Sequence, residues 1–207
     1  MPGPLPRAGG FFAALGPRPD SRSRSARDAR TGRVEIRDTR EVDLAEIAAI
    51  WNHEVLCTDA TTDTEPRDQA AQREWLARHT ESYPAIVAVA AEDVVAYGSL
   101  SPYQPRQAFA RTVEDSVYVK RGQRRAGLGS LILAELIRRA GMLGHHSMLA
   151  RITATNVASL RLHERHGFHL VGVERESAFK LARWHDVTIM QRRLDGIRMG
   201  LITGGSE

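Results

Sequence analysis

The chain has 207 residues, of which 42% are hydrophobic and 26% are charged, a composition typical of a globular protein that can bury a core. Its only cysteine, Cys57, excludes an internal disulfide and a metal cage built from cysteines, and it fits a reducing cytoplasm. No apolar run approaches the roughly 18 residues of a membrane-spanning helix. We therefore expect a cytoplasmic protein with no membrane partner.

The formal net charge of +4 is unevenly distributed. Residues 1–33 hold seven arginines and two acidic residues, a net charge of +5. Subtracting that from the total leaves −1 for residues 34–207. A nearly neutral domain lacks the basic face that nucleic-acid recognition needs, so we expect no nucleic-acid partner.

The first 33 residues are rich in Arg, Ser, Pro and Gly and show no apolar period, which predicts a disordered basic leader. An organellar transit peptide is the alternative, although Asp20 and Asp28 count against it. From Val34 the pattern becomes that of a folded domain, which we place at residues 34–194, followed by a C-terminal tail, 195–207.

The domain opens with a short strand, because residues 34–37 alternate apolar and polar side chains. Asp43 and Glu46 have the spacing of a capping box at a helix start. The i, i+3, i+4 rhythm of the next residues predicts one buried helical face: Leu44, Ile47, Ala48, Trp51 and Val55. Residues 69–80 predict a second, weaker helix.

Three strands follow in the middle of the domain. Residues 85–91 and 94–100 are strand-like and predict a hairpin with Glu92-Asp93 as its turn. Residues 112–119 predict the third strand.

The second half begins with a helix after residues 127–129, with one apolar face made of Leu128, Leu131, Ile132, Leu136 and Ala140. A strand over 148–153 and a short helix over 157–166 come next, and Gly167 ends that helix as a left-handed cap. Strands over 169–173 and 187–191 close a mixed α+β domain.

A glycine-rich turn lies between the predicted strand at 112–119 and the next helix. Gly127 and Gly129 permit close backbone approach, and the free N–H groups of the first helical turn lie at the positive end of the helix dipole. Such a place binds phosphates, and Arg121, Arg124 and Arg125 add positive charge. The alternative is an ordinary loop with solvated arginines.

Two familiar phosphate-binding loops do not fit this turn. A Walker loop is excluded because no Gly-Lys-Ser/Thr follows. A dinucleotide fingerprint is disfavoured because Ile132 stands where its third glycine belongs.

The turn instead resembles a known family motif. Arg124-x-x-Gly127-x-Gly129 is similar to the motif with which GNAT-superfamily acetyltransferases grip the pyrophosphate of acetyl-CoA, and residues 156–168 resemble the second CoA segment of that superfamily. The resemblance implies the GNAT fold, an α+β architecture whose twisted mixed sheet is splayed in the middle and flanked by helices on both faces.

A narrower resemblance, over about residues 34–194, is to phosphinothricin and methionine sulfoximine N-acetyltransferases. It is carried by residues 111–119, 162–164, 179–180, 184–187 and 191–192. It implies direct acetyl transfer from acetyl-CoA to the amine of a small amino-acid-like substrate, without a metal. Family members commonly form dimers, so a homodimer is a candidate assembly. The alternatives are a protein N-terminal or lysine acetyltransferase and a non-catalytic CoA-sensing or nucleic-acid-binding module.

Carried over residue by residue, the resemblance implies the following residues in acetyl-CoA binding: Val117, Tyr118, Val119, Arg124, Arg125, Ala126, Gly127, Leu128, Gly129, Ser130, Asn156 and Ser159. Asn156 directly precedes a predicted helix, so it can equally be a helix N-cap.

Glu114 lies in an otherwise apolar strand and is the candidate general base, because an ammonium must lose a proton before it can attack. In a regular strand Glu114, Ser116 and Tyr118 share one face, and Asp115 interrupts the apolar opposite face. The resemblance implies a β-bulge here. The alternative for Glu114 is a surface carboxylate on an edge strand.

His163 is the candidate acid that protonates the departing thiolate of CoA, as the resemblance implies for its position. It can also be a surface histidine or one that packs on CoA, and Tyr118 is a second candidate donor. Arg106 and Phe109 lie in a proline-containing loop, where the arginine could bind a substrate carboxylate or be a plain surface residue. With Ser116 they are the candidate substrate contacts.

Residues 184–186, Trp-His-Asp, look like a metal-site fragment in isolation. Neighbouring side chains on a strand point to opposite faces and are poorly placed to chelate together. We therefore expect them to be structural or to form a pocket wall, and we expect no metal site.

Overall fold

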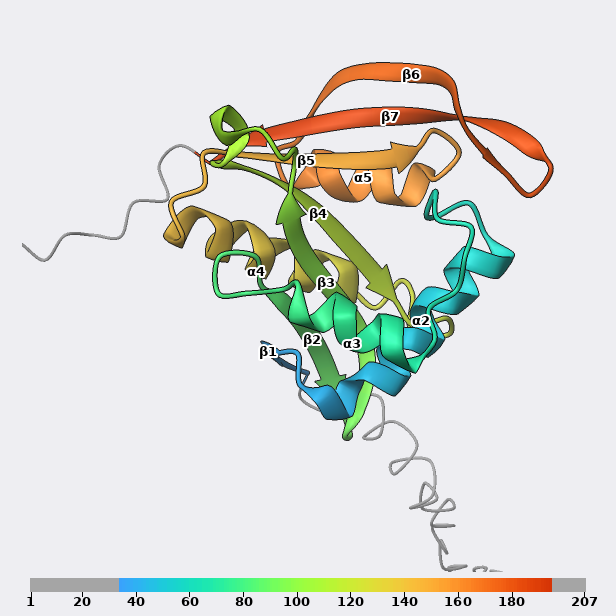
Figure 1. Ribbon diagram of the computed structural model, residues 1–207, viewed down its shortest axis with the longest axis vertical. Helices are drawn as coiled ribbons and strands as arrows, with labels where there is room; N and C mark the ends of the chain where they lie inside the picture. Colours follow the sequence, from blue (N-terminus) through green and yellow to red (C-terminus); the bar gives the residue numbers. More distant parts are fainter. Residues whose placement is uncertain (1–33, 195–207) are drawn as a thin grey trace, which may run out of the picture. The chain divides into compact units, whose positions relative to one another are not determined.

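A mixed sheet of seven strands runs through residues 34–194, the part of the chain that this computed structural model describes (Figure 1). The strand order is β1-β2-β3-β4-β5-β7-β6. Neighbouring strands are antiparallel except β4 and β5, which are parallel. The expected α+β fold class is confirmed. The predicted leader, 1–33, and tail, 195–207, lie outside the described residues.

The strands are β1 (Glu35–Asp38), β2 (Ala85–Ala90), β3 (Asp93–Pro102), β4 (Thr112–Val119), β5 (Ser147–Thr153), β6 (His169–Lys180) and β7 (Arg183–Arg193). The helices are α2 (Leu44–Cys57), α3 (Gln69–Ala77), α4 (Leu128–Met142) and α5 (Val157–Arg165), with short 3-10 turns η1 (Glu41–Asp43) and η2 (Gln107–Phe109). In Figure 1, β6 and β7 form a long hairpin beside β5.

Apolar side chains on the two faces of the sheet form two hydrophobic clusters. α4 covers one face, where Ile132 and Leu136 are fully buried against the sheet. α2 and α3 cover the other face, where Ile47, Trp51 and Trp75 pack on β2 and β3. Both faces of the sheet are apolar, and each amphipathic helix buries its apolar stripe against one of them. Helices therefore cover both faces.

Two local predictions about the helices are wrong. Asp43 does not cap α2: its carboxylate binds Arg37 (2.7 Å) and accepts the backbone N–H of Arg40 (2.7 Å). Glu46 accepts the N–H of Val94 (3.1 Å) instead of closing a capping box. On α4, Leu131 is 47% exposed, because the inward stripe of this helix runs through residues 132, 133, 136, 137 and 140.

Two hairpin turns also differ from expectation. The β2–β3 turn is made by Ala91 and Glu92, one residue earlier than predicted, and both have positive φ (50° and 72°). β6 and β7 run far beyond the predicted 169–173 and 187–191 and meet at Leu181 and Ala182, again with positive φ (51° and 58°). Two-residue hairpin turns favour Asn, Asp or Gly at such positions, so these sequences carry no turn signal.

Candidate active site

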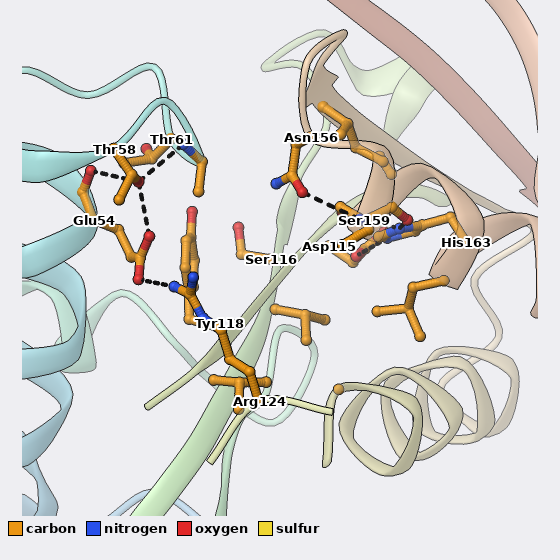
Figure 2. Close-up of a pocket in the computed structure, with 18 of the residues that line it drawn as sticks. Glu54, Thr58, Thr61, Asp115, Ser116, Tyr118, Arg124, Asn156, Ser159 and His163 are labelled. Atoms are coloured by element: carbon orange, nitrogen blue, oxygen red, sulfur yellow. Dashed lines mark hydrogen bonds and ion pairs between the residues drawn. The ribbon is translucent and has the colours of Figure 1, made fainter. Parts of the chain in front are cut away.

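The sheet opens between β4 and β5. The two strands pair only from Thr112 to Glu114 with Ser147 to Leu149. Beyond that point they diverge and leave a cleft of about 860 Å³. Figure 2 shows α2 and the segment after it on one side, α5 on the other, and β4 between them. Backbone groups of residues 115–119 on the β5 side of β4 therefore have no partner strand there and can bind a ligand.

The start of α4 closes one end of the cleft with the residues predicted to bind phosphate. Gly127 is the N-cap residue, has φ +80°, and has no side chain to bond the first turn. The N–H groups of Leu128, Gly129 and Ser130, which line the cleft, thus lie free at the positive end of the helix dipole. A Cβ on Gly127 would meet nothing within 4 Å, so the glycine serves the left-handed backbone conformation. The arrangement suits an anion.

Arg124 and Arg125 line the cleft, whereas Ala126 is not part of the lining. Arg124 forms an ion pair with Glu54 of α2. The second carboxylate oxygen of Glu54 accepts the hydroxyl of Thr58 at 2.7 Å. These contacts tie the loop before α4 to α2.

Asn156 and Ser159 lie at the start of α5 and line the cleft. The side-chain oxygen of Asn156 accepts the N–H of Ser159 at 3.2 Å, so Asn156 is the N-cap of α5. The cap uses only the side-chain oxygen of Asn156. Its amide nitrogen stays available to bind a ligand, so the residue can serve both purposes.

Glu114, Ser116 and Tyr118 share one face of β4 and line the cleft, with Val117 and Val119 beside them. Burial raises the pKa of Glu114 to about 7, against the opposing effect of the Arg151 guanidinium. A carboxyl group that titrates near neutrality can accept a proton at physiological pH.

Asp115, which interrupts the apolar face of β4, pairs with a histidine of α5. β4 follows β3 in an unbroken register throughout, so the bulge implied by the resemblance is not present in these described strands. Asp115 therefore lies on the same side as the buried Val113. Its Oδ2 is 3.0 Å from Nε2 of His163, and Nδ1 of His163 donates to the carbonyl oxygen of Ser159 at 2.8 Å.

The Asp115–His163 pair is buried: 7% of the surface of Asp115 and 3% of that of His163 is exposed. Burial, the largest single effect, would by itself lower the pKa of His163, but the hydrogen bond and electrostatic attraction from Asp115 and the hydrogen bond to the Ser159 carbonyl together outweigh it, so the pKa is raised. Both ring nitrogens therefore point at protein acceptors, although His163 also borders the cleft. The pair holds α5 against β4.

Tyr118 is packed among aromatic rings. It stacks on Tyr97 at 5.2 Å and meets the edge of Trp51 at 5.1 Å. Burial raises the pKa of Tyr118 well above its usual value, and a hydrogen bond with Thr61 only partly opposes this. The phenol therefore keeps its proton at physiological pH.

Arg106 and Phe109 are not brought to the cleft. Both belong to the β3–β4 connection at η2, where Arg106 is exposed and Phe109 packs edge-on against Tyr103 at 5.5 Å. Neither residue lines the cleft. Of the candidate substrate contacts, Ser116 alone lies there.

Sequence reasoning missed the wall formed by α2 and residues 58–63. Glu54 is 2% exposed and continues the buried stripe of Ile47 and Trp51, so a charged residue on an apolar helical face was the available signal. The buried Lys180 donates to the carbonyls of Glu54 (3.2 Å) and Thr61 (2.7 Å). This contact joins the wall to β6, and no local sequence pattern predicts it.

His185 is buried and bonds the carbonyl of Lys180 at 3.0 Å, while Trp184 is largely exposed on the strand's other side. Among residues 34–194 no group of three or more His, Cys, Asp or Glu side chains is placed to hold a metal. Across the same residues, no helix has the length and apolar character to cross a membrane.

Fold and cleft together define the class of protein. Residues 47–168 match the acetyltransferase (GNAT) family, and the chain belongs to this family of N-acetyltransferases. It is 42% identical to a methionine sulfoximine/methionine sulfone acetyltransferase of Pseudomonas paraeruginosa, over 80% of this chain and 97% of that protein. It is 38% identical to a phosphinothricin N-acetyltransferase of Streptomyces coelicolor, over 79% and 98%.

Solved structures of acetyltransferases are similar to this chain in sequence and in fold. The yncA protein of Salmonella typhimurium, solved with its cofactor acetyl-CoA, is 36% identical with a TM-score of 0.76, over 79% of this chain and 95% of that one. A ribosomal-protein-alanine N-acetyltransferase of Brucella melitensis is also 36% identical, with a TM-score of 0.75, over 77% and 99%. The likeness confirms the GNAT fold.

Proposed function

We propose that the chain transfers the acetyl group of acetyl-CoA to the amine of a small amino acid with an oxygen-bearing side-chain head, such as methionine sulfoximine, methionine sulfone or phosphinothricin. The observation that carries the proposal is Glu114, a half-buried carboxyl group on the wall of the cleft, whose pKa desolvation raises to about 7. The substrate class rests on the relatives that bear these names.

The residues of the cleft fit acetyl-CoA. The uncapped start of α4 would hold its pyrophosphate, and the open edge of β4 together with Asn156 would hold its pantetheine arm. When bound, acetyl-CoA supplies an acetyl group activated as a thioester. Even a Cβ at Gly127 would meet nothing within 4 Å, so there is room for a phosphate to approach the backbone directly.

Glu114 takes the proton that the substrate ammonium must lose before its nitrogen can attack. A second proton must reach the departing thiolate. We assign its donation to Tyr118, because the phenol stays protonated at physiological pH while both ring nitrogens of His163 are bonded to protein acceptors. His163 then acts by positioning α5 and β4.

An amine panel tests the function. Release of free CoA is measured with acetyl-CoA and each of methionine sulfone, methionine sulfoximine, phosphinothricin, a lysine peptide and a peptide with N-terminal alanine. We expect kcat/KM for the amino acids to exceed that for the peptides by at least about 100-fold, close to 3 kcal/mol of transition-state discrimination. A preference for the alanine peptide, the chemistry named for the Brucella relative, would overturn the substrate class and leave acetyl transfer standing.

A further inference from the structure

A second cavity of about 260 Å³ lies beside the cleft, on the face of the sheet that α2 and α3 cover. Its walls include Trp51, Arg67, Trp75 and Tyr97. Ser116 and Tyr118 of β4 line both this cavity and the cleft. A molecule held at Glu114 could therefore extend along β4 from one cavity into the other.

Three of the residues that line this cavity each carry a buried hydrogen-bond donor without an acceptor. The donors are Nε1 of Trp51, Nη1 of Arg67 and the hydroxyl of Tyr97. Each is buried, and none has a partner among residues 34–194. A buried donor without an acceptor costs free energy, and such groups in native proteins call for an explanation. Three of them around one cavity suit a group that bears several acceptor oxygens.

Arg67 is held in place before any ligand arrives. Its guanidinium carbon lies 4.0 Å from the ring centroid of Trp51 and 5.5 Å from that of Trp75. Its backbone N–H and carbonyl both bond the side-chain amide of Asn52, at 2.9 Å each. A cation fixed in this way loses little further freedom when it binds an oxygen.

The charge around Arg67 favours an acceptor that is negative or strongly polar. Burial lowers the pKa of Arg67, with Asp63 and Tyr97 only partly opposing the effect. A second cation, Arg78, lines the same cavity, and Asp63 is the one carboxylate in the lining. Burial also lowers the pKa of His79, so that ring adds no fixed charge at neutral pH.

We propose that this cavity is the subsite for the distal oxygen-bearing head of the substrate side chain, a sulfone, sulfoximine or phosphinate, and that Arg67, Trp51 and Tyr97 donate to its oxygens. The inference rests on the proposed function. The distance from Glu114 favours the distal head over the α-carboxylate as the group bound here. Ser116, the residue nearest to Glu114 that lines both cavities, lies two residues along β4, about 7 Å away. An α-carboxylate is too close to its own amine to span that gap.

The test uses the full chain and compares phosphinothricin and methionine sulfone with methionine, which has the same backbone and no head oxygens. Tyr97→Phe removes one unpartnered hydroxyl and keeps the ring. We expect it to lower kcat/KM for the two oxygen-bearing substrates about 3- to 10-fold, and to leave the melting temperature unchanged or raised. Arg67→Gln should lower kcat/KM about 10- to 100-fold for phosphinothricin, less for the neutral sulfone, and hardly at all for methionine.

Arg73→Gln is the matched control, an exposed arginine of α3 that lies outside both cavities, and we expect it to change none of these values. If Arg67→Gln fails to fold, Trp51→Phe replaces it, since it deletes a single donor and keeps an aromatic ring. The inference would be overturned if the variants lost as much kcat/KM with methionine as with the oxygen-bearing substrates, or lost none with the latter. Turnover by the wild-type chain would in that case still support the proposed function. A wild-type chain that acetylates none of the three amino acids would overturn both.

Discussion

Glu114 and Asp115 are neighbours on one strand and have opposite surroundings. Glu114 faces the cleft, where burial outweighs the opposing effect of the Arg151 guanidinium and raises its pKa to about 7. Asp115 points to the other side, where His163 bonds it at 3.0 Å. The alternation of a strand therefore separates a carboxyl group that can take up a proton in the cleft from one that is bonded to His163.

Glu114→Gln should abolish most of the activity while the fold survives. Glutamine keeps the shape and removes the proton acceptor, so kcat should fall by about 10²–10⁴-fold. In the wild type, kcat/KM should rise as the pH increases through about 7, because only the ionised carboxylate can accept a proton. The pH–rate profile of the variant should lose this step.

Thermal unfolding supplies the control for Glu114. Because its pKa is raised in the folded state, this carboxyl group contributes stability at acid pH that is lost as the pH rises from its unfolded value towards about 7. The variant should therefore melt at the same temperature as the wild type or higher at pH 8. Near-normal turnover at neutral pH would show that the proton leaves by another route.

Tyr118 and His163 can be separated by their effects on kcat. Tyr118→Phe keeps the ring contacts with Tyr97 and Trp51 and removes the proton, so we expect a loss of about 10²-fold or more. His163→Asn should lower the melting temperature, because it leaves Asp115 unpaired and buried, and should cost less than about tenfold in kcat. The reverse order of kcat values would make His163 the acid.

At the scale of elements, the cleft depends on how closely α4 approaches the sheet. Gly98 of β3 lies directly under this helix. A Cβ there would lie 2.5 Å from Cγ2 of Ile132 and 2.8 Å from the carbonyl oxygen of Ser116. The oxygen belongs to the backbone of β4 and cannot turn away, so the glycine permits the contact between α4 and two strands.

Gly98→Ala should destabilise the protein by about 1–3 kcal/mol, the usual cost of overpacking a core, as measured by urea unfolding. Gly172→Ala is the matched control: this glycine is also in a strand, and a Cβ there meets nothing within 4 Å. We expect it to be neutral. Equal stabilities for the two variants would contradict the close approach of α4.

The elements also show where local patterns succeed. The positions of β4 and of the start of α4 follow from the local sequence, because glycine spacing and apolar periodicity are properties of neighbouring residues. The length of the β6–β7 hairpin does not follow from the local sequence, because its turn residues, Leu181 and Ala182, have positive φ and are not types that favour it. There the pairing of β6 with β7, and of β7 with β5, supports a turn that the local sequence does not specify.

For the whole molecule, the sequence by itself determined the family and the fold class, and it pointed to the two segments that we propose as the acetyl-CoA site, from Val117 to Ser130 and from Asn156 to Ser159. Backbone freedom at glycines, helix capping and strand alternation act over a few residues, so they can be read along the chain.

The tertiary structure alone decided which side chains meet in the site. It paired Asp115 with His163 across 48 positions, linked Lys180 to Thr61 across 119, and gathered Trp51, Arg67 and Tyr97 around one cavity. It also left Arg106 and Phe109 outside the cleft. Burial and hydrogen bonding between distant residues arise only when the two faces of the sheet are packed, so no local pattern contains them.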